Sequence, residues 1–205
     1  MESNKIYRAL KHKIVWMELE PEKALNLTEL AEEFGVSRTP VKEALLLLQG
    51  GGWVNRHGSH FMVTPLSLNL IKETAEIRNV LETRAALWAM ERISPAELEA
   101  LQQIESDIQA LQDDADRRRL IELDVRFHNL LYEAAKNTQL SRILHELLNH
   151  YLRFWLWRQS PIKRDEFFSA TVDIIRAIRE KDAAALESAC VSHVRKSVTE
   201  ITLLF

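Results

Sequence analysis

The chain has 205 residues, with 27 Lys or Arg against 30 Asp or Glu, and its formal net charge is −3. Cys190 is the single cysteine, which excludes an internal disulfide and fits a reducing compartment. No apolar run approaches the roughly 18 residues of a membrane span, and the first residues lack the apolar core of a signal peptide, so we expect a soluble, cytoplasmic protein with no membrane partner.

Glycine divides the chain into two parts. All five glycines lie at or before residue 58, whereas Leu, Ala, Glu and Arg dominate the rest. Turns that need glycine are therefore confined to the first third, and the remainder can be helical throughout. This pattern predicts two domains, residues 1–65 and residues 66–205.

The first helix with clear boundary signals covers residues 27–34. Asn26 can cap its start, and Glu29 stands where a capping box needs an acid. Gly35 then supplies a residue that accepts positive φ in a tight turn, and Ser37 is expected to cap a second helix. Two helices joined by so short a turn must cross steeply.

The second helix has an apolar face and a polar start. Its apolar residues recur at helical spacing and are expected to pack on the first helix: Val41, Ala44, Leu45 and Leu48. Arg38, Thr39 and Lys42 are left facing outward near the helix start. Recognition helices of DNA-binding proteins contact base edges and phosphates with their first residues, so these three are candidate DNA contacts.

A short hairpin is predicted after the second helix. Alternating residues at 53–56 and 61–63 flank the sequence His-Gly-Ser-His at 57–60. Arg56, His57 and Gly58 lie at the tip of this wing, where a residue without bulk suits a phosphate backbone or a minor groove. A helix, a turn, a helix and a wing together predict a module that binds double-stranded DNA.

Three motifs carry a resemblance to a known family: Gly-Val-Ser-Arg-Thr-Pro-Val-Lys-Glu-Ala-Leu at 35–45, Gly-Trp-Val at 52–54 and His-Gly at 57–58. They resemble the DNA-binding head of the GntR family of bacterial transcription regulators. The resemblance implies that Arg38, Thr39 and Lys42 contact operator DNA and that Gly58 approaches the minor groove.

The chain departs from the usual GntR pattern at two places. Lys42 stands where the family usually has Arg, so a bidentate base contact is replaced by a point charge suited to phosphate. Pro21-Glu22 stands where the loop normally reads Pro-Gly, and we expect that turn to have a different shape.

Residues 66–205 contain no glycine and divide into six predicted helices. Ser67 is expected to cap the first, Ser94 opens the second with a capping box and a following proline, and Asp182 caps the last. Ser160-Pro161 is expected to open the fifth. In the first helix the predicted apolar stripe consists of Leu70, Ile77, Leu81 and Trp88.

The predicted fold class is therefore mainly α, with an N-terminal winged helix-turn-helix followed by an all-α antiparallel six-helix bundle. Three polar residues lie on otherwise apolar stripes of the bundle. Asp124 and His128 share one helix face, and His193 lies on the last helix. A divalent metal would satisfy all three, and a hydrogen-bonded cluster without an ion is the alternative.

The glycine-free helical region behind a GntR-type head resembles the FadR-type ligand domain, the FCD domain, and its six helices resemble the VanR-like branch. The resemblance implies a metal site in which Asp124, His128 and His193 match three ligands, while Thr171 stands at the fourth position in place of His. It implies Zn or Ni held by three protein ligands, or an organic effector in the space that the missing ligand leaves.

Arg78 matches an arginine of the first ligand-domain helix, and the resemblance implies that it pairs with an acid group of an effector near Thr171. The alternative is that Arg78 forms an exposed ion pair with Glu82, four residues later.

These observations predict a ligand-responsive bacterial transcription regulator that binds a palindromic operator as a homodimer and responds to a small-molecule effector, such as an organic acid. It is not expected to be an enzyme. The alternatives are a metal-dependent enzyme built on the helical domain, or a constitutive DNA-binding protein without an effector.

Overall fold

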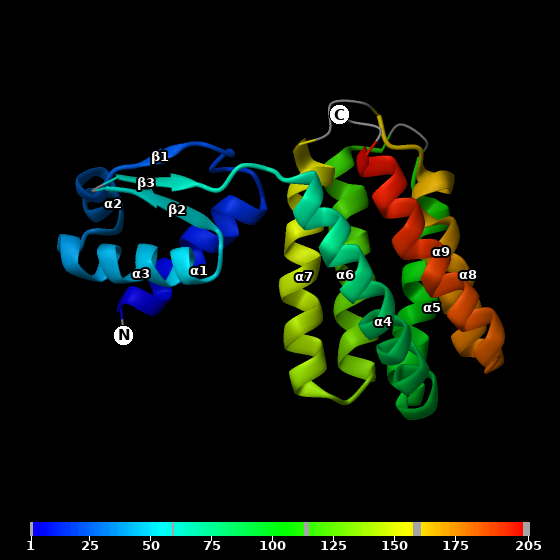
Figure 1. Cartoon of the computed structure of the whole chain (residues 1–205). Helices are drawn as coiled ribbons and strands as arrows, with labels where there is room; N and C mark the ends of the chain where they lie inside the picture. The colour runs from blue at the N-terminus through cyan, green and yellow to red at the C-terminus, as the bar shows by residue number, and fades with distance from the viewer. Residues whose placement is uncertain (1, 59, 113–114, 158–160, 203–205) are drawn as a thin grey trace. The chain divides into compact units, whose positions relative to one another are not determined.

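The computed structural model describes residues 2–58, 60–112, 115–157 and 161–202. The chain forms two compact units, Met1–Ser67 and Leu68–Phe205 (Figure 1). The first contains a small sheet with helices, and the second contains only helices. The predicted fold class, a winged helix-turn-helix followed by a helical bundle, is confirmed.

The N-terminal unit has three helices and three short strands in its described residues. In chain order they are α1 (Glu2–Val15), β1 (Ala24–Leu25), α2 (Leu27–Phe34), α3 (Arg38–Gly50), β2 (Val54–His57) and β3 (His60–Val63). The helix-turn-helix and the hairpin are as predicted. The sequence analysis missed α1, which packs against α3, and β1, which pairs with β3 and gives the strand order β1-β3-β2.

The start of α2 and the turn to α3 follow the local signals closely. The Asn26 side chain accepts a hydrogen bond of 2.8 Å from the amide of Thr28. Its amide group donates to Glu29 at 3.3 Å, so the two side chains interact without a complete capping box. Gly35 has φ of 64°, as the turn requires. Ser37 occupies the position before α3, but its hydroxyl makes no capping hydrogen bond there.

The turn at Pro21-Glu22 retains a left-handed residue. Glu22 has φ of 65°, in the region that glycine favours. Its amide donates to the carbonyl of Val63 at 2.9 Å, and the amide of Val63 donates to the carbonyl of Lys23 at 2.9 Å. These bonds fix the turn to β3, so a residue with a Cβ is held in an unfavourable conformation.

Glu22→Gly is therefore expected to stabilise the N-terminal unit by about 1 kcal/mol, because it removes the steric cost of the left-handed conformation. The measurement is amide hydrogen exchange of peptides from α2 and α3 under mild denaturant. The matched control is Lys23→Gly, at a neighbour without positive φ, which is expected to give no gain. Equal effects of both substitutions would contradict the explanation.

The C-terminal unit is an antiparallel bundle. Its described helices are α4 (Leu68–Arg92), α5 (Pro95–Ala110), α6 (Arg117–Ala134), α7 (Thr138–Trp157), α8 (Arg164–Glu180) and α9 (Ala183–Thr202). Helix α4 packs against α9, α6 and α7, and α8 packs against α9 and α5 (Figure 1). Across the described parts of the chain, no helix combines the length and apolar character needed to cross a membrane.

The predicted start of the fifth bundle helix is wrong. Helix α8 begins at Arg164 with Lys163 before it, and Pro161 lies in non-helical chain. Ser160 lies outside the described residues. Ile162 is buried, so the segment between α7 and α8 packs its own side chain onto the bundle before the helix begins.

The predicted apolar stripe of α4 is also wrong. Ile77 is 50% exposed, and the neighbouring Val80 is 68% exposed. The buried face is instead made by Ile71, Thr74, Ala75, Arg78, Glu82, Ala85, Ala86 and Ala89. The helix carries apolar residues on more than one face, and the bundle buries the face whose small alanines permit close packing and whose two charged residues pair with each other.

Candidate DNA interface and effector site

Helix α3 presents its N-terminal residues to solvent. Arg38, Thr39 and Lys42 are exposed. The apolar residues of the helix are buried, and α3 packs on α1 and α2. The three candidate DNA contacts therefore lie together on the outward side of a well-packed helix, an arrangement that can enter a major groove.

The tip of the wing is held by its own arginine. The Nε of Arg56 donates to the carbonyl of Gly58 at 2.8 Å, and its guanidinium lies 5.6 Å from the centre of the Phe61 ring. Gly58 has φ of 61°, so a side chain at this position would be strained. His57 and Gly58 are exposed, and Ser59 lies outside the described residues. Arg56 thus stabilises the turn and adds positive charge beside it.

The bundle contains a buried ion pair between Arg78 and Glu82. Nη2 and Nε of Arg78 donate to Oε2 of Glu82 at 2.6 Å and 3.1 Å. Tyr132 donates its hydroxyl to the same oxygen at 2.6 Å, and the Arg78 guanidinium lies 4.4 Å from the centre of the Tyr151 ring. The expected ion pair is present, but the expectation that it is exposed is wrong, because both side chains lie in the centre of the bundle.

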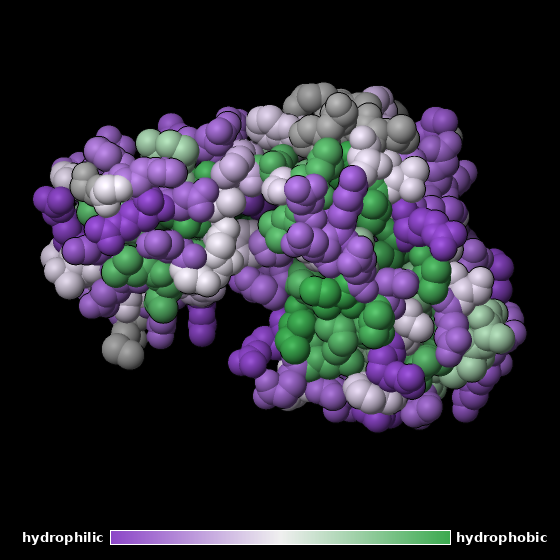
Figure 2. All heavy atoms as spheres, viewed as in Figure 1, coloured by the Kyte–Doolittle hydropathy of each residue, from purple (hydrophilic) through white to green (hydrophobic). Residues whose placement is uncertain are grey.

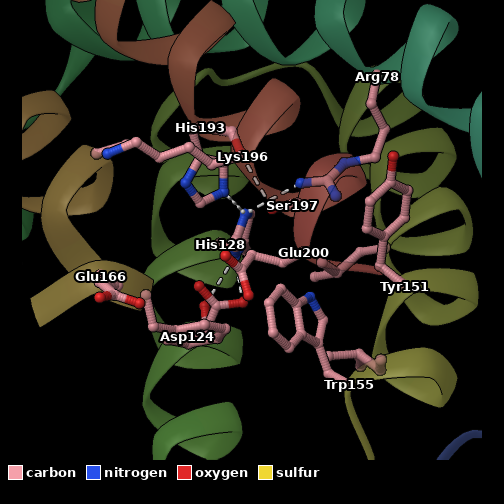
Figure 3. A pocket seen from close by; sticks show the side chains of 14 residues that line it. Arg78, Asp124, His128, Tyr151, Trp155, Glu166, His193, Lys196, Ser197 and Glu200 are labelled. Atoms are coloured by element: carbon pink, nitrogen blue, oxygen red, sulfur yellow. Dashed lines mark hydrogen bonds and ion pairs between the residues drawn. The ribbon is translucent and has the colours of Figure 1, made fainter. Parts of the chain in front are cut away.

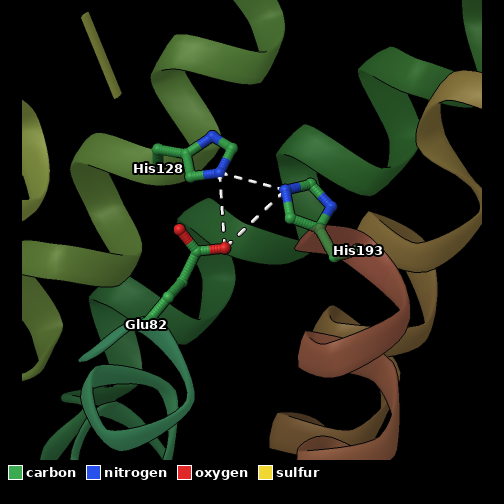
Figure 4. Close-up of side chains that lie close together, drawn as sticks. All are labelled: Glu82, His128 and His193. Carbon is green, nitrogen blue, oxygen red and sulfur yellow. Dashed lines mark hydrogen bonds and ion pairs between the residues drawn. The ribbon is translucent and has the colours of Figure 1, made fainter. Parts of the chain in front are cut away.

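Two imidazoles face each other beside this ion pair. Nε2 of His128, on α6, lies 3.1 Å from Nε2 of His193, on α9. Nδ1 of His128 lies 2.8 Å from the carbonyl oxygen of Asp124 and 3.3 Å from its carboxylate. Oε1 of Glu82 lies 3.8 Å from each Nε2 (Figure 4). This oxygen is buried and makes no hydrogen bond.

Burial and neighbouring charges separate the protonation states of these groups. Burial alone would raise the pKa of Glu82, but the charge of Arg78 and the contact with His128 hold it well below its usual range. Burial alone would lower the pKa of His128, but Asp124 and Glu82 raise it to about 9. Burial lowers the pKa of His193 to about 4. At neutral pH, His128 is protonated and His193 is neutral, so Nε2 of His128 donates to Nε2 of His193.

A small cavity of about 30 Å³ adjoins this cluster, enough space for one or two waters (Figure 3). Its polar wall includes Arg78, Asp124, His128 and His193, and its aromatic wall includes Tyr151, Trp155 and Phe167. Lys196 and Glu200, from α9, also line it. The cavity therefore offers charged groups of both signs and an apolar surface to a small ligand.

The structure brings together four predicted site residues: Arg78, Asp124, His128 and His193. Thr171 is fully buried, and its hydroxyl makes no hydrogen bond, but it is not among the residues that line the cavity. The sequence analysis missed Glu82 as a site residue, because it treated Glu82 only as a surface partner of Arg78.

A metal ion could be held by three of these residues. Ligand atoms of Glu82, His128 and His193 all lie within 4.8 Å of one another. Two imidazoles and a carboxylate form a donor set suited to a divalent transition metal, and the unpartnered oxygen of Glu82 points into this group. The carboxylate of Asp124 lies instead on the Nδ1 side of His128.

Comparisons with known proteins match both units. The FCD domain family matches residues 73–196, and the family described as bacterial regulatory proteins, gntR family, matches residues 2–60. The HTH-type transcriptional regulator YdhC of Bacillus subtilis is 32% identical over 152 residues, which cover 72% of this chain and 66% of YdhC. McbR of Escherichia coli is 30% identical over 139 residues, which cover 67% of this chain and 63% of McbR. The matched regions thus span slightly less than two thirds of these two relatives.

The fold is also found in solved structures. That of E. coli McbR/YncC has a TM-score of 0.85 at 22% identity, covering 99% of this chain and 98% of that chain. Because the family matches cover both the head and most of the bundle, the chain belongs to the GntR family of bacterial regulatory proteins, as a ligand-responsive DNA-binding transcription regulator with an FCD domain.

Proposed function

We propose that this protein binds a palindromic operator as a homodimer, and that a ligand in the bundle cavity changes its affinity for that operator. The observation that carries the proposal is the exposed start of α3, with Arg38, Thr39 and Lys42 free of the packing that buries the rest of the helix. The relatives are transcription regulators, so we propose regulation rather than catalysis as the role of the bundle.

We assign separate tasks to the residues of the head. Arg38 and Thr39 contact base edges in the major groove, and Lys42 contacts phosphate, because an ammonium group is a point charge rather than a bidentate donor. Arg56, His57 and Gly58 place the wing tip against the backbone or the minor groove.

The test of DNA recognition is selection of genomic fragments by the full chain, followed by fluorescence anisotropy with the retained fragments. We expect retention of a palindrome whose half-sites lie about one helical turn, 10 bp, or a multiple of it apart. Salt should weaken binding steeply, because binding releases counterions. Equal affinity for retained and random duplexes at low salt would overturn the proposal.

The proposed dimer surface lies on the bundle. Ile77 and Val80 are large apolar residues exposed on α4, and Leu81 beside them is half-buried. Figure 2 shows hydrophobic side chains gathered on the face of the bundle along which α4 runs. An apolar surface of this kind is typical of a protein interface, and a dimer would supply the second head that a palindrome needs.

The double substitution Ile77→Glu with Val80→Glu is expected to convert the dimer to a monomer, because it places two like charges in each copy of the interface. Light scattering on a gel-filtration column measures the mass. The control is Ile143→Glu, at an exposed apolar residue of α7, which should remain dimeric. A dimeric double variant would show that the copies meet elsewhere.

The ligand proposed for the cavity is a small organic acid that pairs with Arg78, in the region where Thr171 replaces a histidine. A divalent metal such as Zn or Ni is the second candidate, favoured by the two facing imidazoles. Asp124, His128 and His193 are the ligands implied by the family resemblance, and when bound, the ion would supply positive charge to an anionic effector.

A further inference from the structure

We infer that Glu82, rather than Asp124, supplies the carboxylate ligand of a divalent-metal site completed by His128 and His193, and that Arg78 competes with the ion for this carboxylate. The inference rests on the proposed role of the bundle as a ligand-binding domain. It concerns which residues hold the ion and what the ion displaces.

The first support is the convergence of three helices on one point. Glu82 comes from α4, His128 from α6 and His193 from α9 (Figure 4). Oε1 of Glu82 lies 3.8 Å from Nε2 of each histidine. Separations of this size between ligand atoms are compatible with metal–ligand bonds of about 2 Å to a central ion.

The second support is the unsatisfied oxygen. Glu82 is fully buried, and its Oε2 accepts bonds from Arg78 and Tyr132 while its Oε1 has no hydrogen-bond partner. A buried carboxylate oxygen without a partner is costly. Because Oε1 faces the two imidazoles, an ion bound between them would satisfy it without breaking the bond from Tyr132.

Asp124 has a different position in this arrangement. Its backbone carbonyl and carboxylate both lie near Nδ1 of His128, on the opposite side of the ring from Nε2. An oxygen acceptor at Nδ1 fixes the ring orientation and directs the Nε2 lone pair toward an ion. Asp124 is therefore a positioning residue for His128.

Arg78 occupies the same space as the ion would. Its Nη2 lies 3.2 Å from Nε2 of His128 and 2.6 Å from Oε2 of Glu82. A guanidinium and a divalent cation at such distances repel each other, so binding of the ion must move Arg78. Arg78 also lines the cavity, where the released guanidinium could pair with an anionic ligand. Metal binding would thus increase the affinity of the cavity for acids.

The experiment uses the full chain, stripped of metal with a chelator and then titrated with Zn²⁺ or Co²⁺ against a chromophoric competitor. We expect one ion per chain. Glu82→Gln, which keeps an amide oxygen for Arg78, should lower the affinity by more than the roughly 10–100-fold that loss of an outer-sphere partner costs. Glu82→His should restore it, because histidine is also a ligand. Arg78→Gln should raise it, because the competing cation is removed.

The Co²⁺ absorption spectrum separates ligands from positioning residues. Asp124→Asn is expected to weaken binding but to retain the spectrum of the unsubstituted protein, whereas Glu82→Gln should change it. Thermal unfolding of each metal-free variant verifies the fold. Loss of the spectrum in Asp124→Asn alone, or no ion bound at micromolar concentrations, would overturn the inference. Operator binding measured with chelator present tests the proposed function independently.

Discussion

Arg38→Ala is expected to abolish sequence-specific binding of the operator while leaving the fold and the dimer intact. Arg38 is the first residue of α3 and is exposed, so its removal takes no contact from the core of the head. A good bidentate contact to a base discriminates by about 1–3 kcal/mol, and a homodimer loses two such contacts. Fluorescence anisotropy at fixed salt, with the retained palindrome and a scrambled duplex, measures the difference.

Two further variants show whether the loss comes from recognition or from charge. Arg118→Ala removes an equal charge from an exposed residue of the bundle and should leave operator affinity unchanged. Lys42→Ala should weaken binding to operator and scrambled duplex alike and reduce the salt dependence, as expected for a phosphate contact. Full operator discrimination by the Arg38→Ala protein would remove the main support for the assigned recognition helix.

The parts of the head that sequence predicts well are those with local signals. Asn26 at the start of α2 and Gly35 in the turn mark boundaries that the structure reproduces. Helix α1 also carries a signal, because Ile6, Leu10 and Ile14 recur every four residues and are buried, but it lies outside the family motifs. Strand β1 has only two residues, so no alternation can reveal it, and it exists through pairing with β3.

The buried face of α4 could not be predicted from hydrophobic periodicity. That criterion assigns charged residues to the surface, whereas Arg78 and Glu82 lie in the core because each neutralises the other. The same error hid Glu82 from the candidate site. Asp124, His128 and His193 were predicted because they interrupt clear apolar stripes and match family positions, but the side on which Asp124 meets the His128 ring depends on tertiary packing.

The buried Arg78–Glu82 pair should be far more sensitive to single substitutions than to removal of both charges. In metal-free protein, Arg78→Met or Glu82→Leu alone is expected to lower the free energy of unfolding of the bundle by about 3–5 kcal/mol, because each leaves an unpaired charge in a dry interior. Combining them should recover most of this loss, since an apolar pair of similar volume carries no desolvation cost. Denaturant unfolding of the four proteins gives the coupling free energy.

The chain contains a matched pair for comparison. Arg118 and Glu122 have the same spacing on α6, with a distance of 3.2 Å, but both side chains are more than half exposed. Their single substitutions to Met and Leu should each change the free energy of unfolding by only about 0.5 kcal/mol. Recovery in the buried double variant should be incomplete, because the Tyr132 hydroxyl loses its acceptor on Glu82. Adding Tyr132→Phe should then restore stability further. If the buried double variant were as unstable as the sum of its singles, the two charges would not be acting as a pair, and the preference of α4 for burying this face would need another cause.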